Sequence, residues 1–317
     1  MKKPYILILA WVAVLPLVAT SYAGEIFRLA PGVQNQAMGS TGLSYHGSLA
    51  SGWWNPALLA TGPDSGAELM RAEHFEGLLQ QNQLSLSLGG KTRTAINITH
   101  LAIDKVKLTR LENSADTLSN SNRPIVWKTV TNQDFIITAS FARSLSGSTS
   151  LGISPKLAYR DLAGNSGYGF GADLGFLWNS GKGFLAAANL RDFFSTQVLW
   201  ENGTHEVAIP SLDLETAYQM KLFRSDMPLR IALRGEFYAE DRGEASNLQM
   251  GPVTADLHAG VMLQPISSLI VMGGYDYDAI TAGLGIRWNA LGLDYAFKAS
   301  APDGLGSTQR VSASYRW

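Results

Sequence analysis

The chain has 317 residues, no cysteine, 16% charged residues and a formal net charge of −1. The near-neutral charge gives no indication of a nucleic-acid partner. The absence of cysteine excludes disulfides, thiolate metal sites and a lipid anchor on an N-terminal cysteine.

Residues 1–23 are predicted to be a cleaved signal peptide. Lys2 and Lys3 form the basic start, 5–19 is an apolar run, and Ser21-Tyr22-Ala23 supplies small residues for cleavage before Gly24. The alternative is a membrane-anchoring helix, but a run of about 15 residues is shorter than the roughly 20 needed to span a bilayer. No later stretch approaches the apolar length of a membrane helix.

Residues 24–64 are rich in glycine and do not alternate between apolar and polar positions. Pro56 fixes its own φ angle and keeps Asn55 out of the helical region, which suits a tight turn. From residue 65 onward the pattern changes. In 211–222 the even positions are mostly apolar, whereas the odd positions include Asp213, Glu215 and Lys221. Strict alternation of this kind is typical of a strand with two different solvents on its two faces.

The alternation predicts fourteen strands, at 68–75, 82–88, 92–101, 134–143, 149–162, 168–179, 183–191, 211–222, 229–240, 254–263, 268–276, 279–288, 291–299 and 308–317. A soluble β-sandwich also alternates, but its strands are usually about 5–6 residues long. Strands of about 9–12 residues suit tilted membrane strands instead. We therefore expect an all-β fold, a transmembrane antiparallel β-barrel of about 14 strands at 65–317. The lumen of such a barrel is too wide for wall side chains alone to fill, so 24–64 is predicted to be a plug, or hatch, inside it.

The connections between these strands differ in length. The long ones, 102–133, 192–210, 241–253 and 300–307, all fall at one end of the barrel, as outer loops do, which places both chain ends in the periplasm of a Gram-negative-type bacterium. Pro155 lies inside a strand and cannot donate a ladder hydrogen bond, which predicts a bulge or gap. Two interpretations remain open, a local kink or a lateral opening in the wall.

Several segments resemble a known family. Gln36-Ala37-Met38-Gly39-Ser40-Thr41-Gly42, followed by Trp54-Asn55-Pro56-Ala57-Leu58, resembles the N-terminus of the PorV/PorQ family and, more distantly, of the FadL-type fatty-acid channels. The segments 152–159, 293–297 and 310–317 are similar to strand motifs and to the last hairpin of that family. Trp317 stands where Phe is more usual, although an aromatic end still suits the signal that the barrel-assembly machinery reads.

The resemblance implies a FadL-like barrel with an N-terminal hatch, in which Asn55, Pro56 and Ala57 have a structural role. It also implies two functions. The PorV/PorQ likeness points to a docking or shuttle component for secreted proteins or secretion-system subunits, as in type IX secretion. The FadL likeness points to a transporter of hydrophobic small molecules such as long-chain fatty acids. In both cases the barrel contacts outer-membrane lipid.

The inward-facing positions bear on this choice. They carry charges of both signs that can pair across the interior, which favours a polar, plugged lumen and the docking interpretation: Lys156, Arg160, Asp173, Asp213, Glu215, Lys221, Arg230, Arg234, Glu236, Asp256, Asp276, Asp294, Lys298 and Arg310. An apolar pocket built by Met262, Ile270 and Met272 with Trp53 and Trp54 is the alternative that suits transport.

No enzyme, cofactor or metal site is expected. None of the five histidines lies in a metal-spaced pair or beside a nucleophile motif. For the wall we expect Leu214→Arg to impair barrel assembly, because a lipid-facing arginine at mid-bilayer costs about 2–4 kcal/mol, and Asp213→Asn to be tolerated. Heat-modifiable gel migration of the two variants distinguishes them.

Overall fold

The structure is a computed structural model that describes residues 25–62, 65–90, 93–222, 227–240, 242–243, 246–299 and 306–317. The predicted signal peptide, 1–23, lies outside the described residues. Short helical turns precede the strands: α1 (Glu25–Arg28), α2 (Val33–Ala37), α3 (Ser51–Trp54) and η1 (Pro56–Thr61), with η2 (Phe75–Gly77) after the first strand. None of the helices in this part of the chain is long and apolar enough to cross a membrane.

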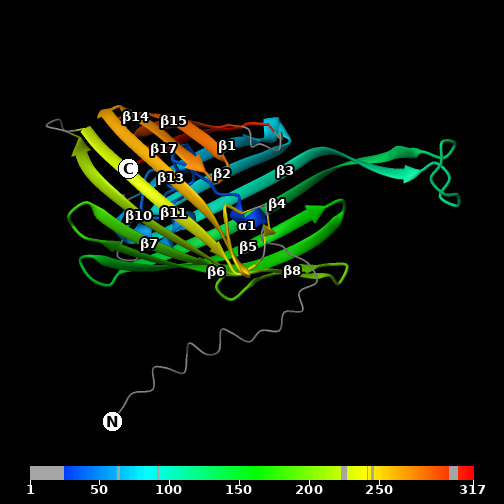
Figure 1. Ribbon diagram of the computed structural model, residues 1–317, viewed down its shortest axis with the longest axis horizontal. Helices are drawn as coiled ribbons and strands as arrows, with labels where there is room; N and C mark the ends of the chain where they lie inside the picture. Colours follow the sequence, from blue (N-terminus) through cyan, green and yellow to red (C-terminus); the bar gives the residue numbers. More distant parts are fainter. Residues whose placement is uncertain are drawn as a thin grey trace, which may run out of the picture.

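Fourteen antiparallel strands form a closed wall (Figure 1), and each pairs with two neighbours. They are β1 (Gly66–His74), β2 (Leu79–Leu88), β3 (Arg93–Leu111), β4 (Pro124–Ser144), β5 (Thr149–Leu162), β6 (Asn165–Asn179), β7 (Phe184–Arg191), β10 (Ser211–Leu222), β11 (Met227–Tyr238), β13 (Val253–Ile266), β14 (Leu269–Asp276), β15 (Ala279–Trp288), β16 (Leu291–Lys298) and β17 (Thr308–Arg316). Pairing of β1 with both β2 and β17 closes the barrel. The predicted barrel is confirmed, and the predicted bounds of 149–162, 211–222 and 279–288 match the observed strands.

Three further short strands lie outside this wall pattern: β8 (Thr196–Trp200), β9 (His205–Ala208) and β12 (Leu248–Met250). β8 pairs with β6 beyond the end of β7, and β9 pairs with β8. The predicted long loop 192–210 therefore contains a β-hairpin, which extends the wall beyond the end of β7.

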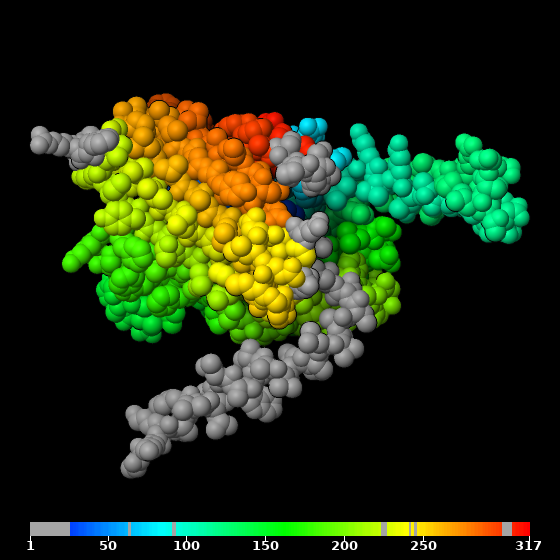
Figure 2. Space-filling model, viewed as in Figure 1, coloured from blue at the N-terminus to red at the C-terminus, as the bar shows by residue number. Residues whose placement is uncertain are grey.

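The expectation that 102–133 is a loop is wrong. β3 and β4 stay paired from Val106↔Val130 to Leu111↔Pro124 and form a two-stranded ribbon, residues 103–132. The ribbon projects from one end of the barrel and stands clear of its body (Figures 1 and 2). Water surrounds both of its faces, so the sequence lacks the apolar and polar alternation that marks the wall strands. We call this end of the barrel the loop end, and the opposite end, with the short connections such as 145–148 and 289–290, the turn end.

The two faces of the wall differ as the alternation predicts. On β10, Leu214 is 43% exposed on the outward face, whereas the adjacent Asp213 and Glu215 are buried in the interior. Of the fourteen predicted inward charges, only Lys221 is exposed and only Lys298 is half-buried, while the others are buried. Two charged residues of β1 depart from the pattern. Arg71 and Glu73 are exposed on the outward face, which is otherwise mainly apolar.

Candidate functional site

The plug, residues 25–62, is held in the lumen by a carboxylate of the wall. Glu215 Oε2 accepts hydrogen bonds from the backbone N–H groups of Gly42 (2.6 Å) and Leu43 (2.9 Å). Its Oε1 accepts from the N–H (3.1 Å) and the hydroxyl (2.5 Å) of Ser44. Arg230 lies 3.3 Å from the same carboxylate. Every strong acceptor site of this buried anion is therefore filled, which is the condition under which a buried charge stabilises a structure. We call this arrangement the Glu215 cradle.

The Asn-Pro-Ala element fastens the plug to a nearby part of the wall, strand β6, which β7 separates from β10. The Nδ2 group of Asn55 donates to the carbonyls of Leu43 (2.8 Å) and Phe176 (2.9 Å), and its Oδ1 accepts from the N–H of Ala57 (3.0 Å). Asn55 has an extended backbone and Pro56 occupies the first turn of η1, as expected for this pair of residues. One side chain thus links two parts of the plug to strand β6.

At Gly39 the backbone of the plug lies directly against the backbone of the wall, near strands β13, β14 and β15. Its φ is +65°, and a Cβ there would lie 2.3 Å from the Ala259 carbonyl oxygen. The N–H of Gly39 donates to the Thr281 hydroxyl (3.0 Å), which in turn donates to the Ala37 carbonyl (3.0 Å). Only glycine permits this approach of backbone to wall.

Two ionisable plug residues are neutral at pH 7. Burial raises the pKa of the Tyr45 hydroxyl to about 12, and it donates to Gln34 Oε1 (2.8 Å). Burial, reinforced by nearby arginines, lowers the pKa of His46 to about 4. The plug therefore adds no charge at these positions. Its polar contacts with the wall are made to wall carboxylates such as Glu68 and by wall arginines, such as Arg234, that donate to plug carbonyls.

The wall is interrupted at Pro155. Backbone pairing of β4 with β5 omits the positions between Thr138↔Lys156 and Phe141↔Ile153, although the register is the same on both sides. Two serines bridge this gap, because the Ser140 and Ser154 hydroxyls are 2.7 Å apart, and Ser154 also donates to the Gly52 carbonyl of the plug (3.1 Å). The predicted gap is therefore present without a bulge, and the plug covers it from inside.

A cavity of about 380 Å³ lies between the plug and the loop end of the barrel. Charged side chains line it on every side, namely Arg28, Arg191, Arg234, Lys298, Arg310, Glu236, Asp276 and Asp278. Aromatic groups contribute as well, with Trp53 from the plug, Phe75 from η2 and Tyr277 after β14. A lining that combines charged groups with apolar surface suits an amphipathic ligand better than a hydrocarbon.

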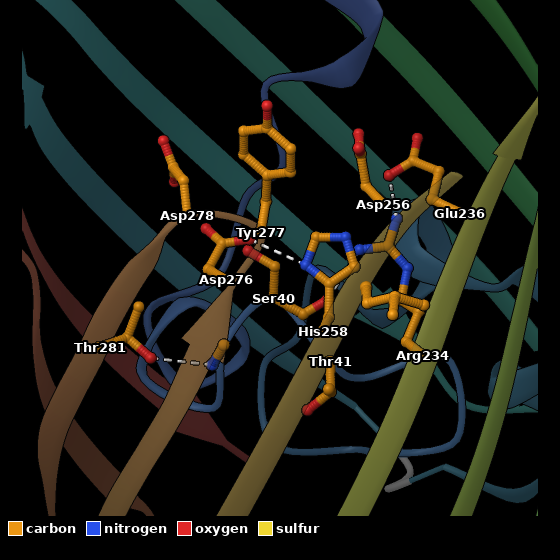
Figure 3. Close-up of polar contacts among 12 residues, drawn as sticks. Ser40, Thr41, Arg234, Glu236, Asp256, His258, Asp276, Tyr277, Asp278 and Thr281 are labelled. Carbon is orange, nitrogen blue, oxygen red and sulfur yellow. Dashed lines mark hydrogen bonds and ion pairs between the residues drawn. The ribbon is translucent and has the colours of Figure 1, made fainter. Parts of the chain in front are cut away.

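Most of the cavity charges are already paired. Figure 3 shows His258 and Asp276 directed toward each other, with the ring Nδ1 2.9 Å from Oδ1, and Arg234 directed toward Glu236 (2.5 Å). Lys298 lies 3.0 Å from Asp276. On the other side of the cavity Asp213 accepts from Arg191 (2.7 Å) and Arg234 (3.1 Å), and Arg191 stacks 4.1 Å from the Trp53 ring.

Arg310 differs from the other cations. It is 4% exposed, and Nη1 donates to the Ala30 carbonyl (2.5 Å). Among the described residues no carboxylate lies within 4 Å of its guanidinium, whereas the other cavity cations each have one. Its Nε, like that of Arg234, has no hydrogen-bond partner. A buried charge without a counter-ion is unfavourable, so Arg310 presents unsatisfied binding capacity to the cavity.

The residues of the predicted apolar pocket lie in two places. Trp53 and Trp54 pack with Leu58, Leu177 and Leu185, and Trp53 also lines the charged cavity. Met262, Ile270 and Met272 face inward as predicted but pack against the plug residues Val33, Ala37 and Met38. The structure therefore does not join the two groups in one pocket.

Sequence reasoning missed Arg191, which lines the cavity, and two other buried charged residues of the lumen. Arg191, Asp134 and Glu68 are buried. Arg191 is the last residue of its strand, Asp134 is the first residue of the predicted strand 134–143, and Glu68 lies in a strand whose alternation is blurred by Arg71 and Glu73. Asn189 lies two residues before Arg191, and residues two apart in a strand share a face. The sequence pattern could therefore have identified Arg191 as inward-facing. Within the described part of the chain, no group of three metal-binding side chains occurs.

No family model and no curated protein matches the chain. Solved structures do match. The toluene transporter TbuX of Ralstonia pickettii aligns with a TM-score of 0.57 and 12% identity, over 91% of this chain and 98% of that one. The toluene transporter TodX of Pseudomonas putida gives 0.56 and 12%, over 90% and 96%. A FadL homologue of Pseudomonas aeruginosa gives 0.51 and 11%, over 90% and 98%.

Identities this low establish the fold alone. They support the FadL-like part of the expected resemblance, and nothing in them supports the narrower PorV/PorQ family. The chain therefore shares the barrel fold of FadL-type transporters and channels.

Proposed function

We propose that the chain is an outer-membrane channel that admits small amphipathic organic molecules through the charged cavity. The loop end faces outward and both chain ends lie in the periplasm, because long connections gather on the outer side of such barrels. The observation that carries the proposal is a closed barrel whose lumen holds a cavity of about 380 Å³ directly above a fastened plug. The fold shared with TbuX and TodX supports it.

The cavity lining indicates the class of ligand. Arg310 provides an uncompensated cation, and Trp53 and Phe75 provide apolar surface. A compact molecule with one negative group and a hydrophobic body satisfies both. Charge-assisted hydrogen bonds to Arg310 fix the anionic end, and the rest of the molecule leaves water.

The ligand leaves the cavity when the plug moves. The plug covers the Pro155 gap through Gly52 and Ser154, so its displacement opens both the lumen below and the wall between β4 and β5. The Glu215 cradle is the strongest polar contact that opposes this movement of the plug, because it receives four hydrogen bonds from residues 42–44.

Influx into liposomes tests the proposal. Benzenesulfonate keeps its charge at all working pH values and crosses lipid slowly, so its entry into proteoliposomes reports the channel. We expect entry above that of empty liposomes with the native protein, and faster entry with Glu215→Ala. Influx equal to empty liposomes for both proteins would contradict the proposal.

A second candidate function, docking of secreted proteins, is favoured by one observation. The ribbon exposes Trp127 at 52%, together with Ile125 and Val126. A two-stranded hairpin is marginally stable alone, and exposed aromatic surface suits a partner. Joining Ile103 to Asn132 through a two-residue turn removes the ribbon. If docking is its role, this variant assembles normally and the cells lose surface attachment of secreted proteins.

A further inference from the structure

A groove of about 610 Å³ crosses the outward face of the barrel over β17, β1 and β2 and reaches β3 and β4. Its walls are mainly apolar, formed by Leu69, Leu84, Ile98, Phe135, Leu293 and Val311. Register places Leu69 beside Leu84 and Ala313, so the groove runs across the strands between two rows of side chains. On a transmembrane barrel this face contacts lipid, and the natural occupant of an apolar hollow is an acyl chain.

One side of the groove is polar. Arg71 lies outward beside Asn82, to whose Oδ1 it donates (2.9 Å), and it also donates to Gln80 (3.1 Å) and Glu73 (3.3 Å). An arginine that faces hydrocarbon costs about 2–4 kcal/mol at mid-bilayer. Its presence here indicates that polar headgroup atoms, rather than hydrocarbon, cover this part of the wall.

A pair of stacked rings forms another part of the groove. His100 lines the groove and stacks on Phe135, with ring centroids 4.5 Å apart. The stacked rings extend the apolar surface on which an acyl chain packs.

We infer that this groove binds a phosphorylated glycolipid, lipid A, with an acyl chain in the apolar part and the headgroup on the Arg71 cluster. A guanidinium binds phosphate through charge-assisted hydrogen bonds. The neighbouring acceptors of Glu73 and Gln80 suit sugar hydroxyl and amide donors, whereas a plain anionic phospholipid offers few donors to them. Lipid A lies in the outer leaflet, so the inference rests on the orientation proposed above, in which the loop end faces outward.

Native mass spectrometry of the delipidated protein in detergent tests the inference, with purified lipid A and phosphatidylglycerol as the probes. We expect the native protein to retain lipid A in preference to phosphatidylglycerol. Arg71→Gln removes the phosphate ligand and weakens retention about tenfold, the effect of one charge-assisted contact. Ala313→Trp fills the groove from the outward face and lowers retention without altering the headgroup contacts.

Arg143→Gln is the matched control, because Arg143 is also exposed and outward but lies on β4 near the turn end. Heat-modifiable migration shows that each variant is assembled. Equal lipid A retention by native protein and both groove variants overturns the inference, as does equal retention of phosphatidylglycerol or a protein dimer that excludes lipid. The influx assay measures the channel separately, so failure of transport leaves this result interpretable.

Discussion

Two charged regions of the lumen are built in opposite ways. In the Glu215 cradle a fully buried carboxylate receives four hydrogen bonds from the plug and faces Arg230. At Arg310 a buried guanidinium has one carbonyl partner and, among the described residues, no carboxylate within 4 Å. In the first region each ion has a counter-ion, whereas in the second the cation has none among the described residues.

The difference separates two uses of buried charge. A compensated ion in the interior holds parts of the chain together, and removal of one partner is severe because the other remains buried and unpaired. An uncompensated ion contributes little to the fold and is available to a ligand. Substitutions in the two regions should therefore affect stability and binding in opposite proportion.

Glu215→Ala should have the largest effect on stability. It leaves Arg230 without its counter-ion and three plug N–H groups without their acceptor, and loss of one partner of a buried ion pair typically costs about 3–5 kcal/mol. The outward face is unchanged, so the wall still assembles, while the plug becomes sensitive to added protease. Urea unfolding in vesicles and limited proteolysis measure both effects. The exposed Glu201→Ala is the control, and native-like protection of the plug in Glu215→Ala would remove the distinction between the two regions.

Asp213→Asn should follow. From the sequence alone this change is expected to be harmless, because Asp213 is simply a polar residue on an inward position. The structure revises that expectation, since the carboxylate lies between Arg191 (2.7 Å) and Arg234 (3.1 Å) and is fully buried. Loss of its charge should cost about 2–3 kcal/mol, measured by the urea midpoint. Asp104→Asn on the ribbon should change nothing, and a native midpoint for Asp213→Asn would restore the original expectation.

Asp213 also shows how much of the lumen the sequence can predict. Period-two alternation identifies which residues face inward, because a one-residue slip would expose every charge to lipid. It therefore predicts the wall strands and most of the buried charges. It does not identify which charges pair, because Arg191 and Arg234 come from strands on either side of β10 and also donate to the plug carbonyls of Trp53 and Ser40.

The plug and the ribbon were harder to predict for two different reasons. The plug has no periodicity, and its conformation depends on contacts such as Glu215 with residues 42–44, about 170 positions apart along the chain. The ribbon is regular, but both of its faces meet water, so hydrophobic alternation gives no signal. In both cases the missing information is tertiary rather than local.

Asn55→Ala should have an intermediate effect. It removes the donor to the Leu43 and Phe176 carbonyls and the acceptor for Ala57, which should cost about 2 kcal/mol since buried carbonyls are left unpaired. Asn202→Ala is the control, because Asn202 makes the same short-range bond to the N–H of Thr204 (2.9 Å) at an exposed turn. The urea midpoints of the two variants should differ clearly, and equal shifts would mean that Asn55 acts only on its own turn.

Arg310→Gln should change stability least, by less than about 1 kcal/mol, because glutamine still reaches a carbonyl and an uncompensated buried charge is removed. Binding should respond in the opposite way. If Arg310 holds the anionic group of the ligand, benzenesulfonate influx should fall about tenfold, the effect of one charge-assisted contact. Arg123→Gln, on the exposed tip of the ribbon, should leave both quantities unchanged. A large loss of stability with unaltered influx would show that Arg310 is a structural ion like Glu215, and the two regions would then differ in geometry but not in use.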